Sequence, residues 1–251
     1  MINLVTSDWR IENIDTVLFD KDGTFIDLHY FWGKMSEMRV KTIIEKYALD
    51  SHLLPELCLK LGYNTSTGKM LSDGITALYS RPIIIQIFAK DLRGYGVDIS
   101  ESELESIFDS VNNEFYKEMV RYTKPIDSAI KFIKELRKNH IKTGVVTSDS
   151  KESSMLTLNH FGWENLFDVV IGRESTKETK ESGVPVKLAL DTIKSNPLST
   201  VMVGDAPMDY IAAKNAGVEK TILVATGQID KKSLLETSPF AVNSLDELSI
   251  I

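Results

Sequence analysis

One pair of aspartates in the sequence has the residue types and spacing needed for chemistry on a phosphate group. Asp20 and Asp22 stand in the pentad DKDGT, directly after the apolar run Thr16–Phe19. A carboxylate held at a strand end can act as a nucleophile, and a second one two residues later can act as general acid and base. Gly23 lets the chain turn sharply toward an anion, and the Thr24 hydroxyl can brace that turn. The alternative is a solvated turn, which Asp and Gly commonly form after strands.

A second pair of aspartates follows another apolar run, Thr200–Val203. Asp205 and Asp209 belong to the segment GDAPMD, with Asp209 on the first turn of the next expected helix. Clustered carboxylates raise one another's pKa unless a cation lies between them, and oxygen ligands suit Mg²⁺. The alternative is helix capping, since Asp is favoured near helix N-termini. Capping competes more strongly for Asp209 than for Asp205.

Hydroxyl and ammonium groups that could bind phosphate oxygens complete the set. Thr147 and Ser148 follow the apolar run Lys142–Val146, where a hydroxyl and a backbone N–H can hold an anion, although a turn or an N-cap is the common alternative. Phosphoryl transfer also needs positive charge on the transferring oxygens. Spacing alone does not choose among the candidate lysines, which are Lys151, Lys177, Lys180 and Lys187.

The elements that must position these groups alternate between strand and helix. Continuous Val/Ile/Leu runs without alternation predict strands buried on both faces, as in a parallel sheet. The runs are Thr16–Phe19, Lys142–Val146, Asp168–Ile171, Thr200–Val203 and Thr221–Val224, with helical patterns at Ile126–Lys138, Pro185–Lys194 and Met208–Asn215. This order predicts a doubly wound, Rossmann-like α/β fold, whose ligands bind beyond the carboxyl ends of the strands. Asp20, Thr147 and Asp205 would stand at those ends.

Residues 27–124 interrupt this alternation. Four segments show helical patterns, at Trp32–Tyr47, Leu53–Leu61, Arg81–Leu92 and Glu101–Val120. We expect no strand here, although Pro82–Ile87 is ambiguous by its period alone. The stretch is too long for a loop. We therefore expect an α/β core domain at 1–26 and 125–251, with an inserted α-helical domain at 27–124.

Together, these segments resemble the haloacid dehalogenase (HAD) superfamily. DKDGT matches its first motif, Thr147 its second, and GDAPMD its fourth. KESGVPVKLAL resembles the third-motif stretch, often written KPxP, and puts Lys180 at the lysine position, with Lys177 as second choice. The chain departs from the pattern there, because Glu181 and Gly183 replace the usual prolines. The helical insert resembles the C1 cap domain of phosphoglycolate phosphatase-like members.

The resemblance implies a role for each residue. Asp20 attacks phosphorus and forms an aspartyl phosphate, while Asp22 protonates the leaving group and then activates water. The resemblance also implies a small phosphorylated metabolite as substrate and Mg²⁺ as cofactor. The implied phosphate-binding residues are Thr147 and Lys180, to which the pattern of residues adds Ser148, Gly23 and Thr24 as candidates. The implied metal ligands are Asp20, Asp22 (through its backbone carbonyl) and Asp205, with Asp209 supporting the ion or binding it through water.

Composition excludes several other classes. The chain of 251 residues carries a net charge of −7, so it lacks the basic character that nucleic acid binding needs. No apolar run approaches the roughly 18 residues of a membrane helix, and no secretory signal is recognisable. The single cysteine, Cys58, cannot form an intramolecular disulfide, which favours a reducing compartment. We expect a cytoplasmic protein without nucleic acid or membrane partners; a homodimer stays open.

Four other functions compete with a phosphatase. A phosphomutase shares every core motif and differs in which substrates the inserted domain admits to the site. A dehalogenase is disfavoured because that branch lacks the second aspartate, present here as Asp22. A phosphoacceptor switch also uses an Asp, a Thr or Ser and a Lys on a doubly wound sheet. A non-catalytic binding relic should have lost an aspartate, and none is missing.

Overall fold

The computed structural model describes all residues from Met1 to Ile251 and divides them into two compact units. One unit comprises Met1–Asp27 and Pro125–Ile251, and the other comprises Leu28–Lys124. We refer to them as the α/β unit and the helical unit.

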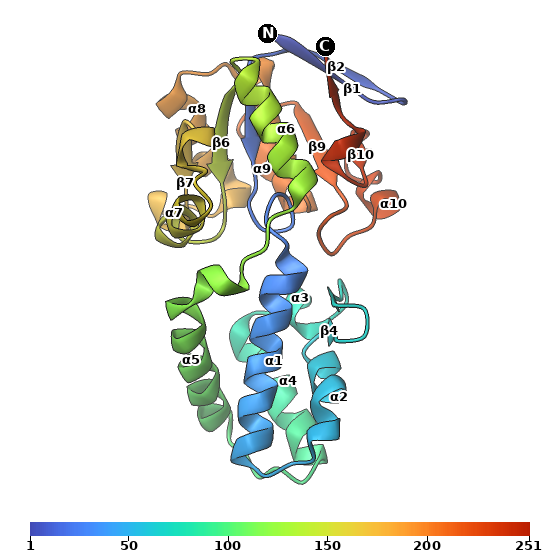
Figure 1. The fold of residues 1–251 in the computed structure, drawn as a ribbon, viewed down its shortest axis with the longest axis vertical. Helices are drawn as coiled ribbons and strands as arrows, with labels where there is room; N and C mark the ends of the chain where they lie inside the picture. The colour runs from blue at the N-terminus through green and yellow to red at the C-terminus, as the bar shows by residue number, and fades with distance from the viewer. The chain divides into compact units, whose positions relative to one another are not determined.

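A six-stranded sheet forms the centre of the α/β unit (Figure 1). The strand order is β10-β9-β8-β3-β6-β7, and every neighbouring pair is parallel. The strands are β3 (Thr16–Phe19), β6 (Lys142–Val146), β7 (Val169–Ile171), β8 (Thr200–Gly204), β9 (Lys220–Val224) and β10 (Ala241–Val242). The predicted parallel sheet is confirmed, with the short strand β10 added at one edge.

Successive side chains of the central strands enter two different cores. On β3, Leu18 packs into one hydrophobic cluster, whereas Val17 and Phe19 pack into another. Because neighbouring side chains of a strand point to opposite faces, both faces of this sheet must be covered. The unbroken apolar runs in the sequence are therefore explained by double coverage.

Helices cover both faces in the doubly wound manner that the sequence predicts. Val186 of α8 and Ala212 of α9 share the cluster of Leu18, while Ile133 of α6 and Leu158 of α7 share the cluster of Phe19. The helices of this unit are α6 (Asp127–Lys138), α7 (Lys151–His160), α8 (Val184–Ile193), α9 (Pro207–Asn215) and α10 (Lys231–Leu234).

A second, three-stranded antiparallel sheet joins both ends of the chain, and the sequence analysis did not predict it. Its order is β11-β1-β2, with β1 at Ile2–Val5, β2 at Arg10–Ile14 and β11 at Ser249–Ile250. Asn3 and Ile251 exchange backbone hydrogen bonds of 2.8 and 3.0 Å. Figure 1 shows the two termini side by side on this sheet.

The helical unit has its own hydrophobic core. Its interior includes Val40, Leu57, Phe88 and Phe108, all almost fully buried. The helices are α1 (Leu28–Lys46), α2 (Leu54–Lys60), α3 (Ile75–Leu78), α4 (Arg81–Gly94) and α5 (Glu101–Lys117). The ambiguous segment Pro82–Ile87 lies within α4 and is helical.

The expectation that this unit contains no strand is wrong. Tyr63–Asn64 (β4) and Lys69–Met70 (β5) form a small antiparallel hairpin. Its turn is stabilised by the side chain of Asn64, whose Oδ1 accepts hydrogen bonds from the N–H groups of Ser66 and Thr67. Strands of two residues are too short to show a period, so pattern analysis cannot detect them.

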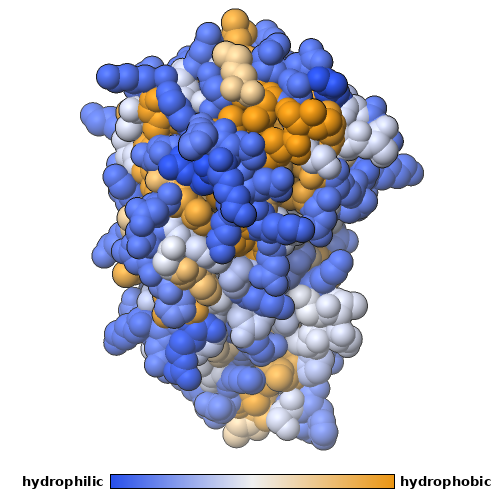
Figure 2. All heavy atoms as spheres, turned by 45° about the horizontal axis from the view of Figure 1, so that its top comes forward, coloured by the Kyte–Doolittle hydropathy of each residue, from blue (hydrophilic) through white to orange (hydrophobic).

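Figure 2 shows one face of the molecule, where most of the surface is hydrophilic and apolar side chains gather in separate patches. Large apolar residues that remain exposed in the α/β unit include Leu156, Leu198, Ile211 and Leu235. Among the helices, none combines the length and the apolar character that crossing a membrane requires.

Candidate active site

Asp20 lies directly beyond the carboxyl end of β3, the strand between β6 and β8. Its N–H donates to the carbonyl of Val203 on β8 over 2.8 Å, which extends the parallel ladder by one residue and fixes the Asp20 backbone. The chain then turns back at once, since the carbonyl of Lys21 accepts from the N–H groups of Phe25 and Ile26. Asp20 is therefore held on rigid backbone and is only 8% exposed.

The second aspartate pair lies at the end of the neighbouring strand β8. Asp205 follows Gly204, the last residue of β8, and Asp209 lies on the first turn of α9. A Cβ atom at Gly204 would lie only 2.1 Å from Oδ2 of Asp209, so only glycine permits this approach. Asp209 Oδ2 also accepts from the N–H of Ala206 over 3.1 Å and caps the helix.

These carboxylates converge. Asp20, Asp205 and Asp209 each offer an oxygen, and these oxygens lie within 4.8 Å of one another. The ammonium group of Lys180 reaches into the same place, with ion pairs of 2.5 Å to Asp20 Oδ1 and 2.6 Å to Asp209 Oδ1. We call these four residues the carboxylate cluster. Lys177, the second candidate for the third-motif lysine, is exposed.

The electrostatic balance of the carboxylate cluster is negative. Burial raises the pKa of Asp20, which the charge of Lys180 opposes. Burial also raises the pKa of Asp205 well above its usual range, and the charges of Asp20 and Asp209 add to this shift. Burial disfavours the charged form of Lys180, but Asp20 and Asp209 outweigh it and raise the pKa of the ammonium. Three carboxylates facing one lysine leave room for additional positive charge.

The hydroxyl residues after β6 differ in their burial. Thr147 is buried, and its N–H donates to the carbonyl of Ile171 on β7 over 3.0 Å. Its Oγ1 accepts from the N–H of Asp149 over 3.1 Å, which leaves the hydroxyl hydrogen able to donate to an anion. Ser148 is exposed, and its hydroxyl lies 3.7 Å from the sulfur of Met208.

The turn after Asp20 is held differently from the way the sequence suggested. Gly23 has a φ of 87°, a conformation that favours glycine, and its carbonyl accepts from the Thr226 hydroxyl over 2.6 Å. The Thr24 hydroxyl, expected to brace this turn, is buried and makes no hydrogen bond within the protein. Thr226, which follows β9, supplies that brace from another strand end.

Three residues near the site escaped the sequence analysis. Lys21 is buried, with its ammonium 2.7 Å from Oδ1 of Asp22 and 3.2 Å from Oδ2 of Asp149. A Cβ atom at Gly227 would lie 1.8 Å from Oδ2 of Asp205, so the loop after β9 packs directly on that carboxylate. Two features of the sequence could have indicated them: Lys21 lies inside the DKDGT pentad, and Asp149 lies two residues after Thr147.

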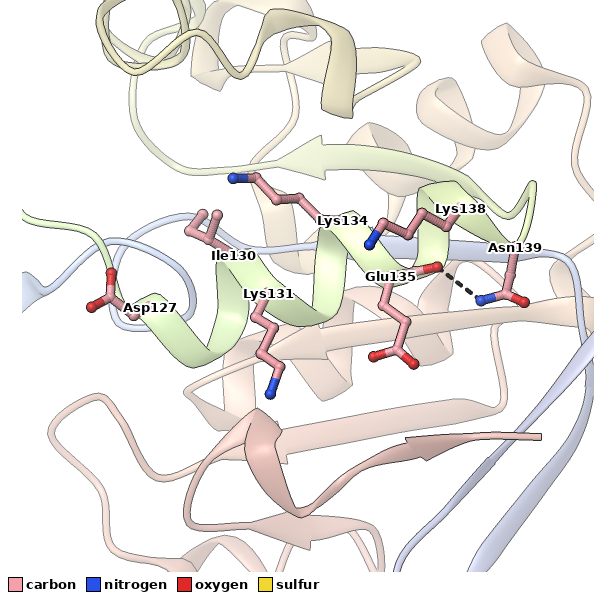
Figure 3. Close-up of a pocket in the computed structure, with 7 residues that line it drawn as sticks. All are labelled: Asp127, Ile130, Lys131, Lys134, Glu135, Lys138 and Asn139. Atoms are coloured by element: carbon pink, nitrogen blue, oxygen red, sulfur yellow. Dashed lines mark hydrogen bonds between the residues drawn. The ribbon is translucent and has the colours of Figure 1, made fainter.

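A surface hollow along α6 is a separate feature (Figure 3). It is lined by Lys131, Lys134 and Glu135 among others, whose side chains are exposed. The carboxamide of Asn139 donates to the carbonyl of Glu135, as the dashed line shows. No buried charged side chain lines this hollow, in contrast to the carboxylate cluster.

The arrangement suits chemistry on a phosphate ester. One buried carboxylate, Asp20, is rigidly held, and a second, Asp22, lies two residues later. A buried lysine and a threonine hydroxyl provide donors for anionic oxygens. The carboxylates of Asp205 and Asp209 beside Asp20 provide oxygen ligands of the kind that Mg²⁺ prefers.

The chain is similar to several known proteins. The family model described as haloacid dehalogenase-like hydrolase matches residues 73–224. A protein of Caldanaerobacter subterraneus, provisionally named pyrophosphatase PpaX, is 32% identical over 82% of this chain and 79% of its own. Phosphoglycolate phosphatase of Aquifex aeolicus is 27% identical over 86% of this chain and 87% of its own. In fold, a HAD-superfamily hydrolase of subfamily IA from Geobacter sulfurreducens matches with a TM-score of 0.67 at 18% identity, covering 97% of each chain.

Proposed function

Because the chain belongs to the haloacid dehalogenase-like hydrolase family, we propose that it is a Mg²⁺-dependent phosphatase that hydrolyses a small phosphomonoester through an aspartyl phosphate on Asp20. The convergence of Asp20, Asp205, Asp209 and Lys180 at the carboxyl ends of two adjacent strands carries the proposal. The family resemblance inferred from the motifs is confirmed by the family match, whereas the residue roles are part of the proposal.

The carboxylate cluster fits a divalent cation by its donor set. All three carboxylates offer oxygen, the pKa of Asp205 is raised well above its usual range by burial and by neighbouring acids, and the acids outnumber the single lysine. Asp20, Asp205 and the backbone carbonyl of Asp22 would hold Mg²⁺, with Asp209 supporting. When bound, the ion would offset the repulsion between the attacking carboxylate and the phosphate.

The chain's own residues divide the reaction between them. The Asp20 carboxylate attacks phosphorus, and the bond to the leaving oxygen breaks as Asp22 delivers a proton to it. Asp22, now ionised, then takes a proton from water, which attacks the phosphorus of the aspartyl phosphate and frees Asp20. Thr147 and Lys180 bind the phosphoryl oxygens in both steps, with the hydroxyls of Ser148 and Thr24 as further contacts. Gly23, also expected as a contact, is not part of this set, because its N–H already donates to the carbonyl of Ile26 over 2.7 Å.

The first experiment is hydrolysis of p-nitrophenyl phosphate by the purified protein. We expect turnover with Mg²⁺, loss of turnover in EDTA and recovery on Mg²⁺ addition. Asp20→Asn should lower kcat about a thousandfold or more, because the nucleophile is removed. Lys131→Met, on exposed α6, is the matched control and should retain wild-type rates. Unchanged turnover in Asp20→Asn would refute the aspartyl-phosphate route.

Assays with a panel of phosphorylated metabolites would identify the substrate class. Relatives are named as acting on pyrophosphate and on phosphoglycolate, so both compounds belong in the first set. Release of inorganic phosphate would identify a phosphatase, whereas isomerised sugar phosphate without phosphate release would identify a mutase. Phosphorylation of Asp20 without turnover of any ester would instead identify a phosphoacceptor switch.

A further inference from the structure

Lys21 is a buried cation that the proposed reaction leaves without a task. Its side chain is only 4% exposed. Removing an ammonium group from water costs several kcal/mol unless the group is paired. The two carboxylates that face it are Asp22, at 2.7 Å, and Asp149, at 3.2 Å. The ammonium thus bridges the loop after β3 and the loop after β6.

Asp149 is the fixed end of this bridge. Its Oδ1 accepts from the N–H of Ser150 over 2.7 Å, and its Oδ2 accepts from the Ser153 hydroxyl over 2.8 Å. Ser150 caps α7, and Ser153 is buried on the first turn of that helix. Because both oxygens are bound to the start of a helix, the Asp149 carboxylate offers Lys21 a rigid anchor.

Asp22 is the end of the bridge that needs an anchor. It lies in the turn between Asp20 and Gly23, and its Oδ1 accepts from the Lys21 ammonium. A general acid must keep its carboxyl oxygen within hydrogen-bond reach of the leaving group. A series of contacts therefore connects α7 to Asp22 through Ser153, Asp149 and Lys21.

We propose that Lys21 is a positioning residue that holds the Asp22 carboxylate in the orientation required for proton transfer to the leaving group. This inference rests on the proposed phosphatase function. Replacing a buried ion pair with apolar side chains is often neutral for stability, so a purely structural need would not select this arrangement. Orienting a carboxylate, in contrast, needs a hydrogen-bond donor of fixed position, which the Lys21 ammonium provides to Asp22 because Asp149 anchors it.

The leaving group provides the test. 2,4-Dinitrophenolate departs without a proton, whereas an alkoxide needs one, so only alkyl esters depend strongly on the general acid. Lys21→Met should lower kcat/KM for glycerol phosphate about tenfold or more, relative to its effect on 2,4-dinitrophenyl phosphate. The ratio of the two values within one preparation is independent of the fraction of folded enzyme. An equal loss for both esters would overturn the proposal.

A double-mutant cycle separates positioning from general damage. In an Asp22→Asn background, Lys21→Met should no longer change the ratio between the two esters, because the group that it positions is gone. If Lys21→Met changed the ratio in the Asp22→Asn background as much as it does in the wild-type protein, the proposal would be contradicted. Lys131→Met is the control for loss of one lysine, and Lys21→Arg should restore part of the ratio because it keeps the charge.

A crystal structure of Lys21→Met supplies a readout that does not depend on turnover. We expect the Asp22 side chain to rotate or lose order, while Asp149 stays on Ser150 and Ser153. An Asp22 side chain that keeps its orientation would overturn the positioning role. If the wild-type protein hydrolyses no phosphoester, the proposed function fails, and this crystallographic comparison alone decides the role of Lys21.

Discussion

At the scale of single residues, the two carboxylate oxygens of Asp209 have different partners. Oδ2 caps α9 through the N–H of Ala206, and Oδ1 pairs with Lys180 in the carboxylate cluster. The sequence offered capping and metal support as competing interpretations. The geometry makes them compatible, because the two oxygens face different partners.

Two substitutions at this position separate the tasks. An amide retains an oxygen that can cap the helix but removes the charge, whereas alanine removes both. We expect Asp209→Ala to be less stable than Asp209→Asn by about 1 kcal/mol, the usual value of an N-cap. Urea denaturation measures the difference, and both variants should lose phosphatase activity. Equal stability would show that the Ala206 contact contributes nothing to folding.

The positions of the key acids could be predicted from the sequence, whereas their supporting contacts could not. Asp20 and Asp205 each follow an apolar run, so a parallel sheet brings both to one edge. The ion pair between Lys21 and Asp149 joins residues that are 128 positions apart in the sequence. No local period or spacing encodes such a pairing, because it depends on how two loops meet in space.

At the scale of elements, the length and polarity of a strand decided whether the sequence revealed it. The five apolar runs are strands because helices cover both faces of the sheet. The strands that escaped prediction are short or carry polar residues, as in β2, with the sequence RIENI. Strands of two residues, such as β4 and β10, leave no period at all.

The loop after β9 acts on the site through Gly227. A Cβ atom there would overlap Oδ2 of Asp205, so Gly227→Ala should displace this carboxylate. We expect the Mg²⁺ concentration for half-maximal activity to rise by about tenfold or more, as for other residues that support a metal ligand. Gly94→Ala is the matched control, because outside the adjoining residues and the backbone of its own helix no heavy atom lies within 4 Å of the added carbon. Wild-type Mg²⁺ dependence in Gly227→Ala would mean that the loop moves aside without disturbing Asp205.

At the scale of the whole molecule, an acidic protein is expected to act on an anion. The net charge is −7, which repels phosphate at long range. Two buried cations, Lys21 and Lys180, lie among the aspartates of the α/β unit, but the acids there outnumber them. The proposed Mg²⁺ would therefore have to supply much of the positive charge that a bound phosphate needs.

The two units have separate cores, and the single cysteine reports on one of them. Cys58 is fully buried in the core of the helical unit, where burial raises its pKa from 9.0 to about 12. Ellman's reagent should therefore leave the native thiol unmodified at pH 8. Modification should begin only when urea unfolds the helical unit. The rate of thiol modification as a function of urea concentration therefore measures the stability of that unit.

The raised thiol pKa also has a consequence for alkaline stability. The Cys58 thiol ionises near pH 9 in the unfolded chain and near pH 12 in the folded chain. Its contribution to the free energy of unfolding is therefore complete below pH 9 and is lost as the pH rises above it. Between these values the helical unit should lose about 1.4 kcal/mol per pH unit relative to Cys58→Ala. Urea titrations of both proteins from pH 8 to about 10.5 measure the divergence. Parallel curves would mean that the folded thiol ionises normally.

The contact between Gly204 and Asp209 has a consequence for how the family can change over generations. A side chain at position 204 would occupy the space of the Asp209 carboxylate, so the two positions are not free to vary independently. A lineage that replaces the glycine must first give up the acid, and with it both the helix cap and the pairing with Lys180. We therefore expect relatives of this chain to keep both residues or to lose both.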